Sequence, residues 1–469
     1  MKMRMFLLLT VFLYAGCAVG PDYRRPQIPA PSSFRAPEPL PAQQTASIAD
    51  LKWFEVFKDP ELQNLVRTAF ERNYDLRDAV ARVAQARAAL GITRADQYPN
   101  FGAGASVDIN RVSRGGATPI PTQLLPSQNR NFGAASLQLL SFEIDLWGRL
   151  RRETEAARAN LLGAEETRKA VLTTLVSDVA TAYLSLREMD YTLEISQRTL
   201  QTREQSLELT RTRQTGGVAT LVDLRQAEQL VQTAAETIPT IQQQIGITEN
   251  RISLLLGQNP GSVSRGRGLT DQVMPPDVPA GLPSSLLERR PDIRVAEQDL
   301  IAANAEIGVA RAAYFPRLTL SGALGGASTQ LSSLFSADHS TWNLHPQVTQ
   351  PIFTAGRIKS GVKFAEAQRE RALIQYERTI QTAFTEVSDA LIAHQRVRER
   401  REKQVALVAT LEDRVRLAYV RYRGGVDTQL NALDADRDLF QAQLDLANIR
   451  LQELLTVVQL YKALGGGWQ

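Results

Sequence analysis

Two kinds of hydrophobic pattern alternate along the chain, and each of them occurs twice. Apolar and polar residues alternate at 101–110 and again at 140–146, and looser versions recur at 318–324 and 344–352. A period of two predicts strands with one apolar and one polar face. Turn-rich loops at 113–130 and 327–341 separate the members of each pair. The sequence therefore predicts four amphipathic strands in two pairs.

A very long helical segment follows each strand pair. No proline occurs between Gly148 and Pro239 or after Pro351, and a helix over 149–213 would be roughly 100 Å long. Apolar residues step by three and four from Leu172 to Leu207, which is the coiled-coil period of 3.5. The same stripe, with polar interruptions, runs from Ile380 to Val415. Each long helix is expected to turn at a glycine pair and to return antiparallel, as far as about 257 in the first hairpin and about 464 in the second.

The two halves of the chain repeat one another. Gly91, Arg94 and Pro99 recur 217 residues later as Gly308, Arg311 and Pro316, and from Gly148 onward the shift becomes 208. A repeat of about 200 residues predicts one architecture built twice. The expected organisation is a signal peptide at 1–16, a strap at 17–58, a first repeat at 59–257, a linker at 258–285, a second repeat at 286–464 and a tail at 465–469.

The N-terminus has the features of a lipoprotein leader. Lys2 and Arg4 precede an apolar run at 6–15 that is too short to span a bilayer, and the run ends near Cys17, the only cysteine among 469 residues. A single cysteine cannot form an internal disulfide, so we predict that Cys17 carries the lipid. The alternative is a leftover cysteine in a cleaved leader.

Composition and motifs argue against nucleic-acid binding and catalysis. Lys and Arg total 54 against 50 Asp and Glu, and no basic run is interleaved with aromatic residues. None of the three histidines has metal-ligand spacing, and no nucleophile elbow occurs. The sequence predicts a protein that is not an enzyme, with no metal and no cofactor apart from lipid on Cys17. Leu430, Asp434 and Arg437 share one helix face beyond the second turn, where a carboxylate and a guanidinium are able to pair. From the spacing alone, a solvated salt bridge on a charged helix is the favoured interpretation.

Several motifs resemble one known family along essentially the whole mature chain. Cys17 opens a Cys-Ala-Val-Gly-Pro-Asp-Tyr segment, Glu288 opens Glu-Arg-Arg-Pro-Asp-Ile, and Gly465 opens Gly-Gly-Gly-Trp. These segments resemble the TolC-like outer-membrane efflux factors, in particular their lipidated NodT-type or OprM-like branch.

The resemblance implies a mainly α fold with a small membrane β-barrel. Four strands and two long hairpins per chain would close, in a homotrimer, as a 12-stranded β-barrel and a periplasmic α-helical barrel. The implied function is a passive outer-membrane conduit for small molecules such as drugs or metal ions. Its implied partners are a periplasmic adaptor protein, an inner-membrane RND-type pump and outer-membrane lipid. Alternatives are an exit duct for protein export with an ABC-type pump, a periplasmic adaptor, or a coiled-coil structural lipoprotein. An adaptor would have one hairpin flanked by β-rich domains, and a coiled-coil protein would lack amphipathic strands.

The resemblance also implies two kinds of functional site near the hairpin turns. The periplasmic gate would comprise Leu430, Asp434 and Arg437, with Asp223 as a weaker member. The adaptor would dock at Thr215, Gly216, Gly217, Val218, Arg423, Gly424, Gly425 and Val426.

Overall fold

The computed structural model describes residues 18–29, 31, 33–36, 47–111, 128–273, 281 and 283–468. Cys17 and the segment 1–16 lie outside these residues, so the predictions of a lipid anchor and a signal peptide stay predictions.

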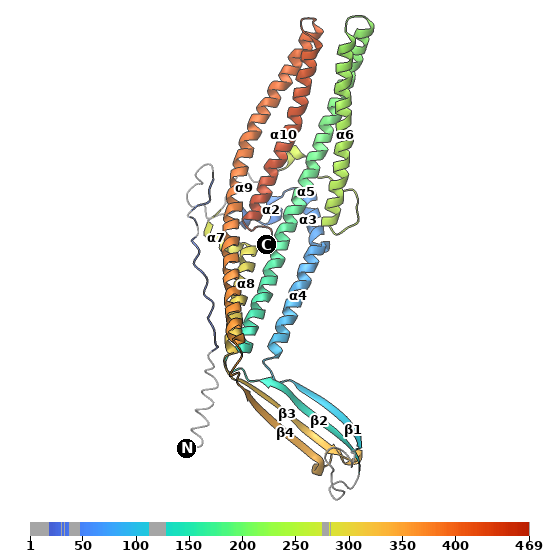
Figure 1. Cartoon of the computed structure of the whole chain (residues 1–469). Helices are drawn as coiled ribbons and strands as arrows, with labels where there is room; N and C mark the ends of the chain where they lie inside the picture. Colours follow the sequence, from blue (N-terminus) through green and yellow to red (C-terminus); the bar gives the residue numbers. More distant parts are fainter. Residues whose placement is uncertain are drawn as a thin grey trace. The chain divides into compact units, whose positions relative to one another are not determined.

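The described chain is mainly helical with one small sheet, as the sequence predicted (Figure 1). The first half contains η1 (Ile48–Asp50), α2 (Trp53–Val56), α3 (Pro60–Arg72), α4 (Tyr74–Ala95), β1 (Phe101–Arg111), β2 (Asn129–Glu143), α5 (Arg149–Thr215) and α6 (Leu221–Leu255). The second half contains η2 (Leu269–Asp271), α7 (Pro283–Arg289), α8 (Pro291–Ala312), β3 (Arg317–Ser328), η3 (Leu331–Ser333), η4 (Ala337–His339), β4 (Ser340–Thr349), α9 (Arg357–Arg423) and α10 (Gln429–Ala463).

The chain forms two compact units, and each unit takes residues from both halves of the repeat. The first unit comprises 1–26, 83–163 and 296–376, and the second comprises 27–82, 164–295 and 377–469. The boundaries between them fall inside α4, α5, α8 and α9. Within the described residues, no helix combines the length and the apolar character needed to cross a membrane.

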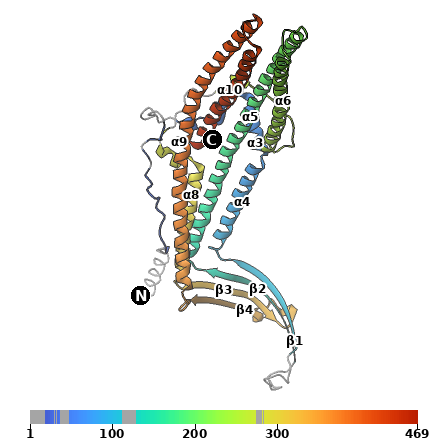
Figure 2. The ribbon, with the colours of Figure 1, turned by 45° about the horizontal axis from the view of Figure 1, so that its top comes forward.

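The first unit contains an antiparallel sheet in the order β1-β2-β3-β4, which both ribbon views show as one curved layer (Figures 1 and 2). β2 begins at Asn129, well before the alternating run at 140–146 that predicted it. The sequence did not predict this earlier start, because the small residues of 133–136 show no alternation of apolar and polar side chains. Register in β2 shifts between Leu139 and Phe142, which is a β-bulge. β4 ends at Thr349, so Ile352 lies beyond the strand, after Pro351 has removed a backbone donor.

Beside the sheet, α5 packs against α8 in the first unit. Ala156 and Ala159 of α5 form a buried cluster with Ala302 and Ala305 of α8. Small side chains on both helices allow their backbones to approach closely. This contact joins the end of the first repeat's strand pair to the start of the second repeat.

The second unit is held by the stripe predicted on α5. Leu175, Val179, Ala182 and Leu186 are all buried, as steps of three and four along one helix face require. Tyr183 on the neighbouring stripe is fully buried, and its hydroxyl donates to Asp59, 2.9 Å away. Asp59 also caps α3 by accepting from the backbone N–H of Glu61. The stripe therefore builds the core of this unit and fixes the helix start that the sequence predicted.

Candidate gate and docking site at the hairpin turns

The first hairpin turn connects α5 to α6 within the second unit. Gly217 has φ of +74°, and the backbone N–H of Val218 donates to the carbonyl of Arg213 at 2.8 Å, which closes the end of α5. A Cβ atom placed on Gly217 would meet nothing within 4 Å. Glycine is needed here for its left-handed backbone conformation and not for space.

The second turn repeats this geometry between α9 and α10. Gly425 has φ of +73°, and the backbone N–H of Val426 donates to the carbonyl of Arg421 at 3.1 Å. Arg423 ends α9, with its guanidinium 5.9 Å from the ring centroid of Tyr419. Both predicted reversals at glycine pairs are present in the structure.

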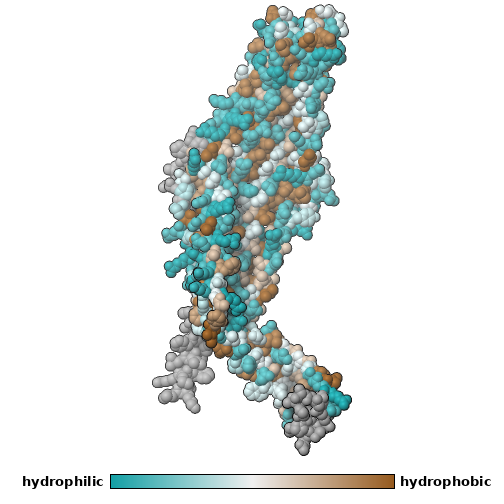
Figure 3. All heavy atoms as spheres, viewed as in Figure 1, coloured by the Kyte–Doolittle hydropathy of each residue, from teal (hydrophilic) through white to brown (hydrophobic). Residues whose placement is uncertain are grey.

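Apolar side chains are exposed at both turns. Val218 is 73% exposed and Val426 is 67% exposed, and Leu221 and Val222 are also exposed. The space-filling view shows apolar surface among hydrophilic surface where the hairpins end (Figure 3). Each turn thus has at least one exposed apolar side chain, and adaptor docking at the turns stays a prediction.

The three residues of the predicted gate lie together on the first turns of α10. Leu430 is the second residue of the helix and is exposed, and the Arg437 guanidinium is 3.2 Å from the Asp434 carboxylate. Both charged side chains are substantially exposed. The structure therefore shows the ion pair that the spacing predicted, and an exposed pair of this kind contributes about 0.2–1 kcal/mol.

This ion pair continues into a short chain of charges. Arg437 also lies 3.3 Å from Asp438, and Asp438 is 2.7 Å from Arg414 on α9. The hydrogen bond from Arg414 lowers the pKa of Asp438 below its usual range, with Arg437 adding to the shift. The charges link α10 to α9 across the second hairpin.

Asp223, which the sequence predicted only weakly as a gate residue, makes local contacts that account for an aspartate at this position. Its carboxylate accepts from the backbone N–H and the hydroxyl of Thr220, both at 2.7 Å, while its own backbone N–H donates to the Thr220 hydroxyl. This reciprocal arrangement is a capping box at the start of α6. A gate role for Asp223 stays a prediction.

A buried ion pair that the sequence did not predict joins the two hairpins. Arg203 of α5 is 4% exposed, and its Nε donates to Asp436 of α10 at 2.7 Å. Arg203 also donates to the carbonyl of Leu230 and lies 4.9 Å from the ring centroid of Phe440. The sequence does contain a sign of this pair, because Arg203 is a charged residue on the apolar stripe of α5. A charged side chain that is buried there requires a partner of opposite charge.

Further polar contacts follow α5 toward the turns. Gln429 of α10 donates to the Thr210 hydroxyl at 2.6 Å, and the hydroxyl of Tyr422 on α9 donates to the Gln429 carbonyl oxygen at 3.1 Å. The guanidinium of Arg213 lies 4.6 Å from the Tyr422 ring centroid. Over the last four turns of α5, polar side chains such as Arg203, Thr210 and Arg213 therefore make the contacts between the two hairpins.

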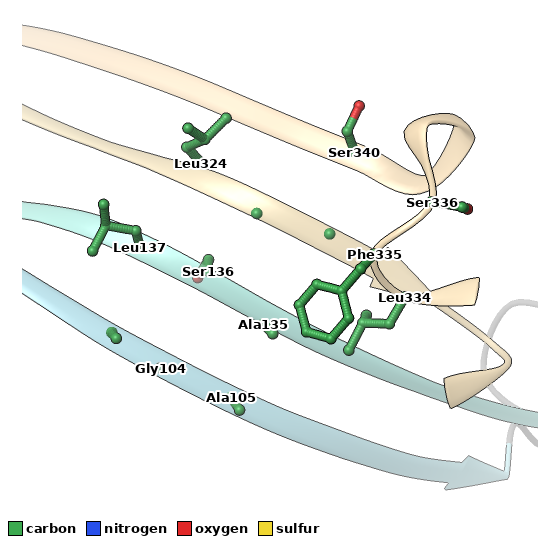
Figure 4. Close-up of a pocket in the computed structure, with 13 residues that line it drawn as sticks. Gly104, Ala105, Ala135, Ser136, Leu137, Leu324, Leu334, Phe335, Ser336 and Ser340 are labelled. Carbon is green, nitrogen blue, oxygen red and sulfur yellow. The ribbon is translucent and has the colours of Figure 1, made fainter. Parts of the chain in front are cut away.

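A hollow on the sheet of the first unit was also considered as a site. Its lining includes Gly104, Ala135 and Ser136 on the strands and Phe335 on the loop after β3, which points over them (Figure 4). None of its lining residues is titratable, so the lining offers no side-chain acid or base. Among the described residues, no cluster of His, Cys, Asp and Glu is arranged to hold a metal ion.

A duplicated chain with a small antiparallel sheet and two long helical hairpins has the fold of outer-membrane channel proteins. Residues 65–258 and 282–466 match the family model described as outer membrane efflux protein, and the chain belongs to that family.

Relatives and solved structures agree with this membership over the full length. The chain is 38% identical over 475 residues to the probable efflux pump outer membrane protein TtgC of Pseudomonas putida, covering 100% of this chain and 96% of TtgC. It is 33% identical to the probable outer membrane lipoprotein SilC of Salmonella typhimurium, covering 100% and 99%. The open-state MtrE outer membrane channel of Neisseria gonorrhoeae matches with a TM-score of 0.86 and 30% identity, covering 97% of this chain and 99% of MtrE. The chain is therefore an outer-membrane channel component of an efflux pump, as the sequence predicted.

Proposed function

We propose that three copies of this chain form a passive conduit which receives small molecules from a periplasmic adaptor and an inner-membrane pump. Four strands per chain give twelve in a trimer, and the paired hairpins of three chains would continue the passage into the periplasm. The pump would supply the energy for transport, and this chain would supply the passage.

The observation that carries the proposal is the placement of charge and apolar surface at the hairpin turns. Leu430, Asp434 and Arg437 lie within three turns of the second reversal, and the exposed valines lie on the reversals themselves. We propose that Leu430 forms an apolar ring that resists wetting and that Asp434 pairs with an arginine, either Arg437 or one on a neighbouring helix, and so helps to hold the closed state. An adaptor binding at Val218 and Val426 would then act within a few residues of the gate.

Small organic molecules are the cargo that the relatives favour. Relatives that cover the full chain include an antibiotic efflux pump protein and a toluene efflux pump protein of Pseudomonas putida. A channel of this kind leaves selection to the pump, and the proposal assigns the chain no specificity of its own. Protein export with a different pump remains the second candidate, and no feature of the described residues favours it.

A lipid on Cys17 would anchor the chain at the sheet end of the first unit. Ala18 packs on Gly148, where a Cβ atom would lie 2.7 Å from the Ala18 Cα, and the backbone N–H of Val19 donates to the carbonyl of Trp147. The relative SilC is described as a lipoprotein. Labelled fatty acid should therefore enter the wild-type chain and not Cys17→Ser, and equal labelling would refute the anchor.

The conduit itself is tested by transport in cells that lack this chain but contain its adaptor and pump. Restoring the wild-type chain should lower the accumulation of a fluorescent dye, and purified protein in planar bilayers should conduct ions. Cys17→Ser serves as the matched variant, because it removes the proposed anchor and leaves the gate and the turns unchanged. Dye accumulation that is unaffected by the wild-type chain would overturn the efflux function.

A further inference from the structure

One side of the sheet in the first unit is apolar, and the ladders show which residues share that side. Directly opposite residues on antiparallel strands point to the same side of a sheet. The ladders connect Ala105 of β1 to Ala135 of β2, and Ala135 to Gly326 of β3. We call their side of the sheet the outer face. Large apolar side chains on the outer face are exposed, among them Val107, Ile109, Leu137, Leu324, Trp342 and Leu344.

The opposite side of the sheet is polar. Asp108, Gln138 and His345 lie on it, at positions that alternate with those of the outer face. In a membrane sheet with this alternation, the apolar side contacts lipid and the polar side lines the passage. The family places this chain in the outer membrane, so the outer face contacts the lipid of that membrane.

The loop after β3 folds back over the outer face. Gly326 and Ser328, two alternate residues of β3 on this face, are buried. A Cβ atom on Gly326 would overlap the carbonyl oxygen of Leu334, so glycine is needed for the loop to approach at this position. The Ser328 hydroxyl lies 2.7 Å from that of Ser333 and holds the loop in place. Residues 329–339 therefore cover the far end of β3 on the outer face.

Next to this loop, the outer face is hollowed (Figure 4). The hollow has a volume of about 580 Å³. Its floor is a row of small residues on three adjacent strands, Ala105, Ala135 and Gly326, which lie directly opposite one another in the ladders. Leu334 and Phe335 of the loop border the hollow, and the Phe335 side chain is 85% exposed. The chain thus forms a hollow with a floor of small residues and an apolar rim on a surface that contacts lipid.

We propose that this hollow holds one acyl chain of an outer-leaflet lipid, with Phe335 lying against that chain. An acyl chain is long, thin and apolar, and it needs no hydrogen bond from the surface that receives it. The lining matches this chemistry, since no described residue of it carries a charge and its side-chain hydroxyls are those of Ser136, Ser336 and Ser340. The small residues of the floor allow close contact along the acyl chain.

Other occupants fit the hollow less well. Exported molecules would pass along the polar side of the sheet, which is the side opposite the hollow. A neighbouring copy of the chain would add to the edge strands β1 and β4, whereas the floor is centred on β2, whose neighbours on both sides belong to the same chain. The bilayer is therefore the source of the occupant.

The position of the hollow along β3 identifies the leaflet. β3 begins at Arg317, shortly after α8 ends at Ala312, and the helices extend into the periplasm. Gly326 is nine residues further along β3, which is about 30 Å of strand and, at the usual tilt, about 20–25 Å of height. The apolar band of a membrane sheet is about 25 Å tall, so the hollow lies in its outer part. The outer leaflet of an outer membrane consists mainly of lipopolysaccharide, whose lipid A part supplies the acyl chains.

This inference rests on the outer-membrane location of the chain and on the sheet of a single unit. It does not rest on the proposed gate, on the adaptor or on the pump. Lipid retention and dye efflux are separate measurements, so a failure of the lipid site is distinguishable from a failure of the transport function.

Native mass spectrometry of the full-length protein, purified from bacterial outer membranes, tests the hollow. The probe is the lipopolysaccharide that the host membrane supplies. After extended washing in detergent, the wild type should retain one molecule that contains lipid A per chain, while lipids in general contact with the outer face are washed away. Ala135→Phe places a ring on the floor of the hollow and should lower the retained fraction by about tenfold, because the added volume excludes the acyl chain.

The matched control is Ala134→Phe, which makes the same change one residue earlier on the polar side of the same strand and should retain lipid like the wild type. Phe335→Ser is a second variant that leaves the strands intact, because the Phe335 side chain is mostly exposed, and it should lower the retained fraction severalfold. Equal retention in the wild type and in both hollow variants would mean general lipid contact only and would overturn the site. A wild type that retains no lipid, or only phospholipid, would overturn it as well.

Discussion

The turns of the two hairpins agree closely in backbone conformation, with φ of +74° at Gly217 and +73° at Gly425. Their side chains differ in charge. At the shift of 208, Gln226 and Gln229 of α6 correspond to Asp434 and Arg437 of α10. The ion pair of the proposed gate thus exists in only one of two repeats that fold alike.

The same difference holds deeper in the hairpins. Arg203 of α5 corresponds to Leu411 of α9, a half-buried residue packed against Val408 and Leu446. Since the second hairpin is built with an apolar residue at this position, the fold does not require a charge in the first. The comparison shows that the two hairpins have the same fold and that the charged residues between them are not needed for that fold. Function is the better explanation for their presence.

The largest expected effect comes from giving the first hairpin the apolar residue of the second. Arg203→Leu would leave the Asp436 carboxylate buried without its cation, at a cost of about 3–5 kcal/mol in the free energy of unfolding. Denaturant unfolding in detergent measures this cost. Replacing both residues in Arg203→Leu with Asp436→Leu should recover most of the loss, since an apolar pair needs no compensation. A single variant as stable as the wild type would show that the pair is not a structural link between the hairpins.

The next largest effect is expected at the proposed gate, where two substitutions give the second hairpin the glutamines of the first. Asp434→Gln with Arg437→Gln removes an exposed pair of about 0.2–1 kcal/mol from each chain, so three chains would shift the closed–open balance by up to about a hundredfold. Single-channel conductance in planar bilayers should rise.

The control for this experiment is Gln226→Ala with Gln229→Ala, which changes the matching positions of the first hairpin without removing charge. Conductance like that of the wild type in the Asp434 and Arg437 variant would mean that the pair is only a solvated bridge. In that case the constriction would have to lie elsewhere in the channel.

A smaller effect is expected at the turns, where the two hairpins are alike. Val218→Arg or Val426→Arg would place a charge on an apolar contact and should weaken adaptor binding by about tenfold, the cost of losing one well-packed contact residue. Site-specific cross-linking to the adaptor measures this binding, and trimer content should not change. If only one of the two variants weakens the cross-link, the adaptor distinguishes the hairpins, and the comparison extends from their charges to their surfaces.

The sequence predicted the long helices and the strands, but it did not predict the start of β2 or the buried ion pair between the hairpins. Both outcomes have physical reasons. The stripe from Leu172 to Leu207 repeats over many turns, so its period alone determined one long helix and its buried face. The start of β2 was missed because small residues carry no alternation of hydrophobicity. The partner of Arg203 was missed because Asp436 is 233 residues away, and a periodic pattern on one helix does not identify the residue that it faces. The Asp434–Arg437 pair was predictable because both members lie on the same turn of one helix.

The smallest expected effect is a pH dependence that only the second hairpin should show. His394 of α9 is half-buried and corresponds to the buried Leu186 of α5, and its Nδ1 lies 2.9 Å from the Thr456 hydroxyl on α10. Burial lowers the pKa of His394, and the nearby guanidinium of Arg398 lowers it further. The folded state therefore favours the neutral imidazole more than the unfolded state does.

The sign of this effect follows from the proton balance. Below the unfolded pKa of about 6.5, the unfolded chain binds a proton that the folded chain resists, so the free energy of unfolding should fall as the pH drops through that value. The effect should be small, because His394 is only partly buried. His394→Leu, which copies the first hairpin, should flatten the profile between about pH 7.5 and 5. A profile that keeps its slope in His394→Leu would assign the acid sensitivity to carboxylates common to both hairpins.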